Sequence, residues 1–116
     1  MEAIYQQIAQ SRVTGTSALK LFKLSDLTPT PTRVRIKNFI VCNSTGTDLS
    51  FSAYHDKDGT TYDNTTALFL STTIKANSTV QQNLDLGMVD HAENFAVKSS
   101  ASLGLTYTLY GEVVNE

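Results

Sequence analysis

The stretch Arg33-Val34-Arg35-Ile36-Lys37 decides the fold class, because basic and apolar side chains alternate along it. A β-strand sends successive side chains to opposite faces of a sheet, so this pattern predicts a strand with a basic row opposite an apolar row. Similar alternation recurs in the segments 49–54, 80–86 and 105–113. No segment has the length and periodicity of an ordinary α-helix. The sequence therefore predicts an all-β protein.

Turn signals built from Gly, Pro, Asn and Asp separate these segments at intervals of roughly ten residues, a spacing typical of a sandwich or a barrel. We expect one antiparallel β-sandwich of seven to eight strands. It is of the jelly-roll or the immunoglobulin-like kind, and both remain open because strand order cannot be deduced from the pattern. Residues 1–12 form an N-terminal arm or first strand, and residues 13–116 form the single sandwich domain.

The bulk composition narrows the function classes. The 116 residues carry 17% charged side chains and a net charge of −2, so no overall attraction to nucleic acid follows. No apolar run approaches the roughly 20 residues that span a bilayer, and no secretory signal is visible at the start of the sequence. The single cysteine, Cys42, excludes an internal disulfide, and we expect it to be a small buried apolar residue.

The run from His55 to Asp63 is the strongest candidate for a metal site. Asp56, Asp58 and Gly59 resemble the start of a calcium loop, and Asp63 adds a further carboxylate. Lys57 places a positive charge among them, and the bidentate Glu of such loops is missing. A hairpin with Asp-Gly at its tip explains the run more simply, so we predict no metal ion and no other cofactor.

No catalytic arrangement is visible in the sequence. The two histidines, His55 and His91, lie far apart, and neither has a second ligand at metal-binding spacing. No serine lies in a nucleophile elbow, and no glycine-rich phosphate loop is present. We therefore expect a protein that is not an enzyme.

Two groups of side chains are candidates for contact with a partner. The apolar residues of the N-terminal segment, Ile4, Tyr5 and Ile8, lack an evident core role. The basic row could contact phosphate or an acidic protein, although a solvated sheet face explains it as well. The five tyrosines could also form a platform for sugars, although several lie at positions typical of a core. The basic row consists of Arg33, Arg35 and Lys37.

Short motifs follow one another along nearly the whole chain, and each of them is only a strand with a turn. The motifs are Ile8-Ala9-Gln10, Leu21-Phe22-Lys23, Phe39-Ile40-Val41-Cys42-Asn43, Phe51-Ser52-Ala53, Ile74-Lys75-Ala76-Asn77-Ser78-Thr79 and Tyr107-Thr108-Leu109-Tyr110-Gly111-Glu112-Val113. In their order and spacing the chain resembles small virion proteins of tailed bacteriophages. The acidic insert from His55 to Asp63 departs from the pattern of those proteins.

This resemblance implies a β-sandwich protein of the virion, with no catalytic residues. The expected role is a decoration or cement protein that binds the major capsid protein or other virion proteins on the head surface, as a homo-oligomer and preferably a trimer. A tail adaptor, a fibre base or a receptor- or glycan-contact domain is the alternative. Neither nucleic acid nor membrane is an expected partner.

Overall fold

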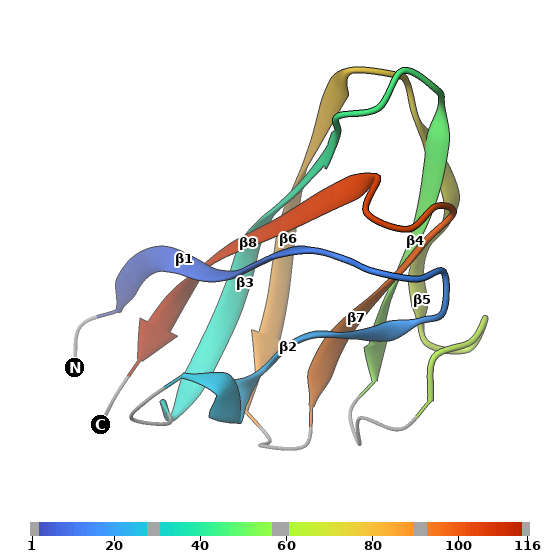
Figure 1. The fold of residues 1–116 in the computed structure, drawn as a ribbon. Coiled ribbons are helices and arrows are strands. Elements are labelled where there is room, and N and C mark those ends of the chain that lie inside the picture. The colour runs from blue at the N-terminus through green and yellow to red at the C-terminus, as the bar shows by residue number, and fades with distance from the viewer. Residues whose placement is uncertain (1–2, 28–30, 57–60, 90–92, 115–116) are drawn as a thin grey trace.

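Antiparallel strands make up most of the computed structural model, which describes residues 3–27, 31–56, 61–89 and 93–114 (Figure 1). The all-β prediction is confirmed. The only helical element among these residues is a short 3-10 turn, η1 (Leu24–Asp26), and none of them forms a helix suited to crossing a membrane. The eight strands are β1 (Ile4–Arg12), β2 (Leu19–Lys23), β3 (Arg33–Asn43), β4 (Leu49–Asp56), β5 (Ala67–Ile74), β6 (Ser78–Met88), β7 (Asn94–Ser99) and β8 (Leu105–Val114).

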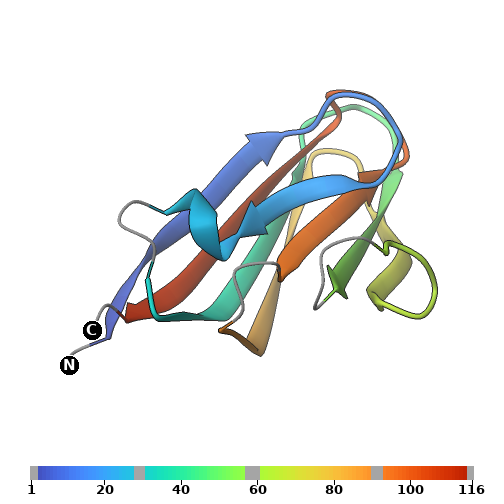
Figure 2. The same ribbon diagram turned by 90° about the horizontal axis from the view of Figure 1, so that it is seen from below.

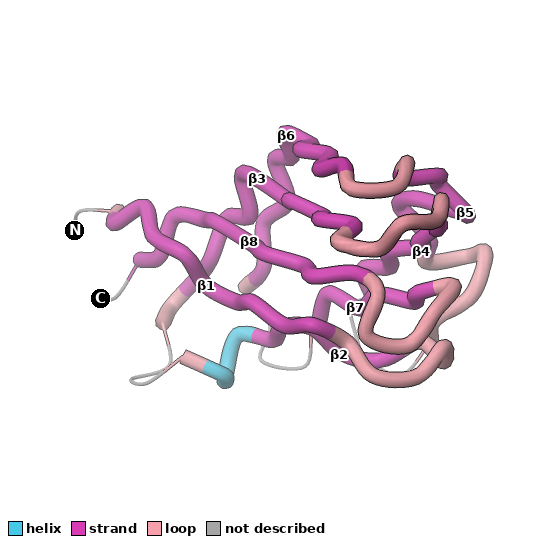
Figure 3. Tube along the Cα trace, turned by 45° about the horizontal axis from the view of Figure 1, so that its top comes forward, coloured by secondary structure: helices cyan, strands magenta, loops and turns pink. Residues whose placement is uncertain are grey.

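The strand order identifies the sandwich as a jelly roll. One sheet has the order β1-β8-β3-β6 and the other has β2-β7-β4-β5. Figure 3 shows β6, β3, β8 and β1 in succession across one layer. The pairs β1–β8, β2–β7, β3–β6 and β4–β5 together form one long antiparallel ribbon, folded so that consecutive pairs alternate between the sheets. An immunoglobulin-like sandwich instead places its first two strands side by side in one sheet, and here β1 and β2 lie in different sheets (Figure 2).

The first strand, β1, is an edge strand of the first sheet and pairs with β8 from Ile4 opposite Val113 to Arg12 opposite Thr106. The start of β1 and the end of β8 therefore lie side by side, as Figures 1 and 2 both show. Ile8 is only 8% exposed and belongs to the core cluster, so this segment is built into the sheet.

A β-bulge at Lys37 reverses the facing of side chains along β3. Val34 and Ile36 point into the core before the bulge, and Phe39 and Val41 do so after it. The alternation at 33–37 thus predicts the first half of the strand and not the second. Because Phe39 and Val41 face inward, Cys42 faces outward and is half-buried, so its expected full burial was wrong.

Gly111 on β8 lies against the bulge. A Cβ atom at this position would come within 2.6 Å of the carbonyl oxygen of Arg35 and 3.3 Å of the Cα of Ile36. These are backbone atoms, which cannot move aside as a flexible side chain can. Glycine is therefore required for β8 to approach β3 at the bulge.

An aromatic cluster fills the space between the sheets. The Phe39 ring packs edge-to-face against Phe95, with centroids 5.0 Å apart, and against Phe51 at 5.6 Å. Tyr107 is fully buried, and its hydroxyl shares a 2.6 Å hydrogen bond with Ser99. Burial raises the pKa of Tyr107 to about 12, although the hydrogen bond to Ser99 acts in the opposite direction. The neutral phenol is thus part of the core.

Asn43, at the end of β3, fastens a turn to the neighbouring sheet. Its Nδ2 donates to the carbonyl oxygens of Thr47 at 2.9 Å and Ile74 at 3.0 Å, with a longer contact of 3.3 Å to that of Lys75. Its Oδ1 accepts from the backbone N–H of Thr45 at 3.0 Å and from its hydroxyl at 2.7 Å. Asn43 is 1% exposed, and these bonds satisfy a polar group that would otherwise be costly to bury.

Candidate functional site

The outward face of the β1-β8-β3-β6 sheet brings together chemically diverse side chains from all four strands. Strand register aligns Tyr5 on β1 with Glu112 on β8, Glu112 with Arg35 on β3, and Arg35 with Gly87 on β6. We call this set the Tyr5–Gly87 row. It places an aromatic ring, a carboxylate, a guanidinium group and a position without a side chain in one line across the sheet.

Tyr5 reaches across β8 and is held at two points. Its ring stacks on Tyr110, with centroids 6.1 Å apart and planes inclined by 18°. Its hydroxyl accepts a 2.6 Å hydrogen bond from Nδ2 of Asn38 on β3, and Oδ1 of Asn38 accepts one of 3.1 Å from Gln81 on β6. Tyr5 nevertheless remains 52% exposed, so an oriented aromatic surface is open to solvent.

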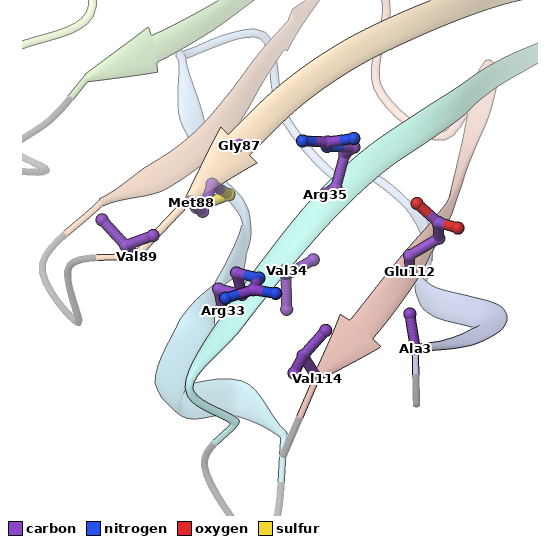
Figure 4. A pocket seen from close by; sticks show the side chains of 9 residues that line it. All are labelled: Ala3, Arg33, Val34, Arg35, Gly87, Met88, Val89, Glu112 and Val114. Carbon is purple, nitrogen blue, oxygen red and sulfur yellow. The ribbon is translucent and has the colours of Figure 1, made fainter. Parts of the chain in front are cut away.

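A hollow of about 320 Å³ lies against Glu112, the cross-strand neighbour of Tyr5, at the end of the sheet where β3 begins. Figure 4 shows Arg33 and Arg35 on β3, Glu112 on the neighbouring β8 and Gly87 across the hollow on β6. A Cβ atom added at Gly87 would meet no atom within 4 Å, so the missing side chain leaves open space. The remaining lining is mainly apolar and comes from Ala3, Val34, Met88, Val89 and Val114.

The charges around the hollow nearly balance. Nε of Arg35 lies 3.2 Å from Oδ1 of Asp85, and Nζ of Lys37 lies 3.9 Å from the same oxygen. These pairs are well exposed, so each contributes little to stability. Arg33 and Glu112 form no ion pair with another described residue. The hollow thus presents separate hydrogen-bond donors and acceptors without a strong net field.

The predicted partner-contact residues separate into two groups. Ile4, Tyr5, Arg33 and Arg35 are exposed, and Lys37 is half-buried at the bulge. Ile8 was expected on a contact surface, but its side chain packs in the core, because strand alternation places it on the face opposite to that of Tyr5. Glu112, Gly87 and Asn38 were missed, since only strand register brings them to the same place.

The five tyrosines do not form one platform. Tyr107 and Tyr54 are buried, at 0% and 5% exposure, and Tyr62 packs near Tyr54 with ring centroids 6.2 Å apart. Only Tyr5 and Tyr110 meet on the outward face of the first sheet.

In the described part of the 55–63 loop, the carboxylates considered as calcium ligands accept hydrogen bonds from residues nearby in the sequence. Oδ2 of Asp56 accepts the Thr61 N–H at 2.5 Å, and Oδ1 of Asp63 accepts the N–H and hydroxyl of Thr65 at 2.8 and 2.5 Å. The hydrogen bond from the Thr65 hydroxyl, followed by that from its N–H, holds the pKa of Asp63 below its usual value. Asp58 lies outside the described residues, among which no three His, Cys, Asp or Glu side chains gather as a metal site.

His55 has a neighbour that its sequence position did not suggest. Its Nε2 lies 3.2 Å from Oε1 of Glu93, whose other oxygen accepts a 2.7 Å hydrogen bond from the N–H of Val89. Both side chains are largely buried. The contact ties the end of β4 to the segment before β7. His91 lies outside the described residues.

Comparison of the whole structure with solved structures finds viral proteins. The coat protein of Tobacco streak virus, solved as a dimer, matches with a TM-score of 0.54 at 10% sequence identity, over 98% of this chain and 88% of that chain. The chain shares its jelly-roll fold. A protein of the infectious bursal disease virus particle matches with a TM-score of 0.55 at 10% identity, again over 98% of this chain but 31% of that one.

The VP2 subviral particle of infectious bursal disease virus is a third similar structure, with a TM-score of 0.50 and 12% identity over 32% of its chain. The jelly roll described here thus corresponds to about a third of the longer proteins. No family model matches the sequence, and no curated protein matches it.

Proposed function

We propose that the chain is a structural protein of a virion. The observation that carries this proposal is its strand order, a jelly roll that aligns over 98% of the chain with the Tobacco streak virus coat protein. The described residues add a core of packed aromatic rings, and their His, Cys, Asp and Glu side chains form no cluster suited to a metal. Assembly is therefore the function that this arrangement supports best.

Within the virion, the proposed role is a decoration or cement protein on the head of a tailed bacteriophage. The motif order along the sequence supports this finer assignment, whereas the similar structures come from Tobacco streak virus and infectious bursal disease virus. The proposed partners are the major capsid protein and further copies of the chain, preferably as a trimer. A position in the tail is the alternative.

The edge strand β5 is the surface that we assign to contact with the shell. Leu68 and Leu70 are 42% and 51% exposed on a strand that contains no charged residue. Natural edge strands are commonly protected by lysines. β2, at the other edge of the same sheet, contains Lys20 and Lys23. An uncharged edge with exposed leucines is therefore suited to being covered in an assembly.

Deletion of residues 1–12 would be a poor test, because it removes β1 and with it the buried Ile8. A cleaner test mixes the purified protein with shells that lack it and measures cosedimentation. We expect Leu70→Glu to abolish binding. The matched control Leu103→Glu changes a leucine of similar exposure, 45%, in the β7–β8 turn and should leave binding unchanged. Equal binding by both variants would refute the assignment of β5.

The virion assignment has its own test, in the virus whose genome encodes the chain. Mass spectrometry of purified particles should detect the protein, and electron cryo-microscopy should show jelly-roll density at regular positions on the head. Density confined to the tail would overturn the decoration role. Absence of the protein from purified particles would overturn the virion role itself.

A further inference from the structure

We propose that the Tyr5–Gly87 row and its adjoining hollow bind a neutral saccharide. This inference depends on the outward face of the first sheet and is independent of the proposed virion role. The volume of about 320 Å³ lies at the lower end of the range for small-molecule sites, which are mostly apolar with a few well-placed polar groups. The lining described above has this composition.

The aromatic part of the row suits the apolar face of a sugar ring. Tyr5 offers an exposed ring whose orientation is fixed by Tyr110 and Asn38 before any ligand arrives. A side chain that is already ordered loses less conformational entropy on binding. Stacking on Tyr5 therefore requires little rearrangement of the protein.

The polar part of the row suits the hydroxyl groups of a sugar, each of which donates and accepts. The carboxylate of Glu112 only accepts hydrogen bonds, and the guanidinium groups of Arg33 and Arg35 only donate them. Glu112 is the direct cross-strand neighbour of Tyr5 and also lines the hollow. A sugar that stacks on Tyr5 and extends past Glu112 into the hollow would thus place hydroxyls near both kinds of group.

The balance of charge favours a neutral ligand over an anion. Arg35 is already paired with Asp85, and the two remaining charged residues of the lining, Arg33 and Glu112, are opposite in sign. A phosphate or a strongly acidic peptide would meet the Glu112 carboxylate at close range, and like charges repel at such distances. The basic row taken alone would suggest an anionic ligand. The neighbouring carboxylates of Asp85 and Glu112 favour a neutral one.

Gly87→Leu is the decisive variant, because a Cβ atom there meets no other atom within 4 Å and the leucine side chain would occupy the hollow. Gly46→Leu is its matched control. It makes the same change in similarly open space, in the β3–β4 turn at the opposite end of the sheet. Two further variants, Tyr5→Ala and Glu112→Gln, remove the stacking surface and the acceptor charge respectively. Circular dichroism and thermal melts establish that each variant is folded.

The probe is an array of immobilised neutral and acidic oligosaccharides, whose multivalent display makes weak binding detectable. We expect the wild-type chain and Gly46→Leu to bind one or more neutral glycans. Folded Gly87→Leu and Tyr5→Ala should bind at least about tenfold more weakly, and Glu112→Gln several-fold more weakly. The glycan identified is then titrated in solution and followed by NMR, where the shifted resonances should belong to the row.

Absence of binding across the array would overturn the proposal. Equal binding by Gly87→Leu and Gly46→Leu would do the same, as would a preference confined to acidic glycans. Sedimentation of each variant provides a further check. If Gly87→Leu alters the oligomeric state, the face is a contact between copies of the chain and not a sugar site.

Discussion

Replacing Asn43 by alanine should destabilise the protein by about 3 kcal/mol. The substitution removes four good hydrogen bonds, and each contributes about 0.5–1 kcal/mol net. It also leaves the buried carbonyl oxygen of Ile74 without that donor, whereas the groups nearer the surface can bind water. For a domain of this size the loss corresponds to a fall in Tm of roughly 12 °C. It is a large part of a total stability of about 5–15 kcal/mol.

The assay is equilibrium unfolding in urea, followed by far-ultraviolet circular dichroism. The matched control is Asn83→Ala, which makes the same change at an exposed position of β6 and should stay within about 0.5 kcal/mol of the wild type. If Asn43→Ala costs no more than this control, the hydrogen bonds do not fasten the turn and the reasoning is refuted.

Asn43→Asp tests the same geometry through pH. The new carboxyl keeps the acceptor toward Thr45 but turns its other oxygen toward the carbonyl oxygens of Thr47 and Ile74. Burial and this repulsion should raise its pKa above the unfolded value of about 3.9. The variant should therefore be least destabilised below about pH 4 and lose stability as the pH rises through the folded pKa. A penalty that does not change with pH would contradict the assigned contacts.

Three further outcomes follow from the fold. Gly111→Ala should cost about 1–3 kcal/mol in urea unfolding, because its Cβ would meet the Arg35 carbonyl oxygen, while Gly87→Ala should be tolerated. Because the folded pKa of Tyr107 is raised to about 12, its neutral phenol contributes stability that is complete below about pH 10 and lost as the pH rises toward 12. Tyr107→Phe should flatten that alkaline decline in urea titrations, and an unchanged decline would show that Tyr107 is not its source. Arg35→Ala should change stability by less than about 1 kcal/mol, because its ion pair is exposed, and a larger loss would show that the pair is structural.

Local alternation predicted the strands but not the places where strands depart from regularity. The period-two pattern at 33–37 identifies β3 correctly, but it does not predict the bulge at Lys37. The bulge depends on Gly111, which lies more than 70 positions away in the sequence. The outward facing of Cys42 follows from the bulge and could not be predicted without it.

The candidate site was even less predictable from local sequence patterns than the strand irregularities. Tyr5 and Arg35 could be recognised from the sequence alone. Tyr5 is an apolar residue in a terminal segment, and Arg35 belongs to the basic row. Glu112 and Gly87 carried no such signal, since each resembles an ordinary strand residue. Their place in the candidate site can be recognised only from the strand register, which aligns them with Tyr5 and Arg35 across the sheet.

The pairing of the first strand with the last has a consequence for how the protein is made. β1 hydrogen-bonds only with β8 in the described structure, so residue 4 must find residue 113 before the first sheet is complete. Contacts this distant in sequence slow folding, because the chain must close long loops before it gains their stabilisation. During synthesis, β1 therefore remains unpaired until residues 105–114 have left the ribosome. In contrast, β4 and β5 can pair much earlier. Until β8 is available, the newborn chain is exposed to chaperones and to premature association with its own copies through β1.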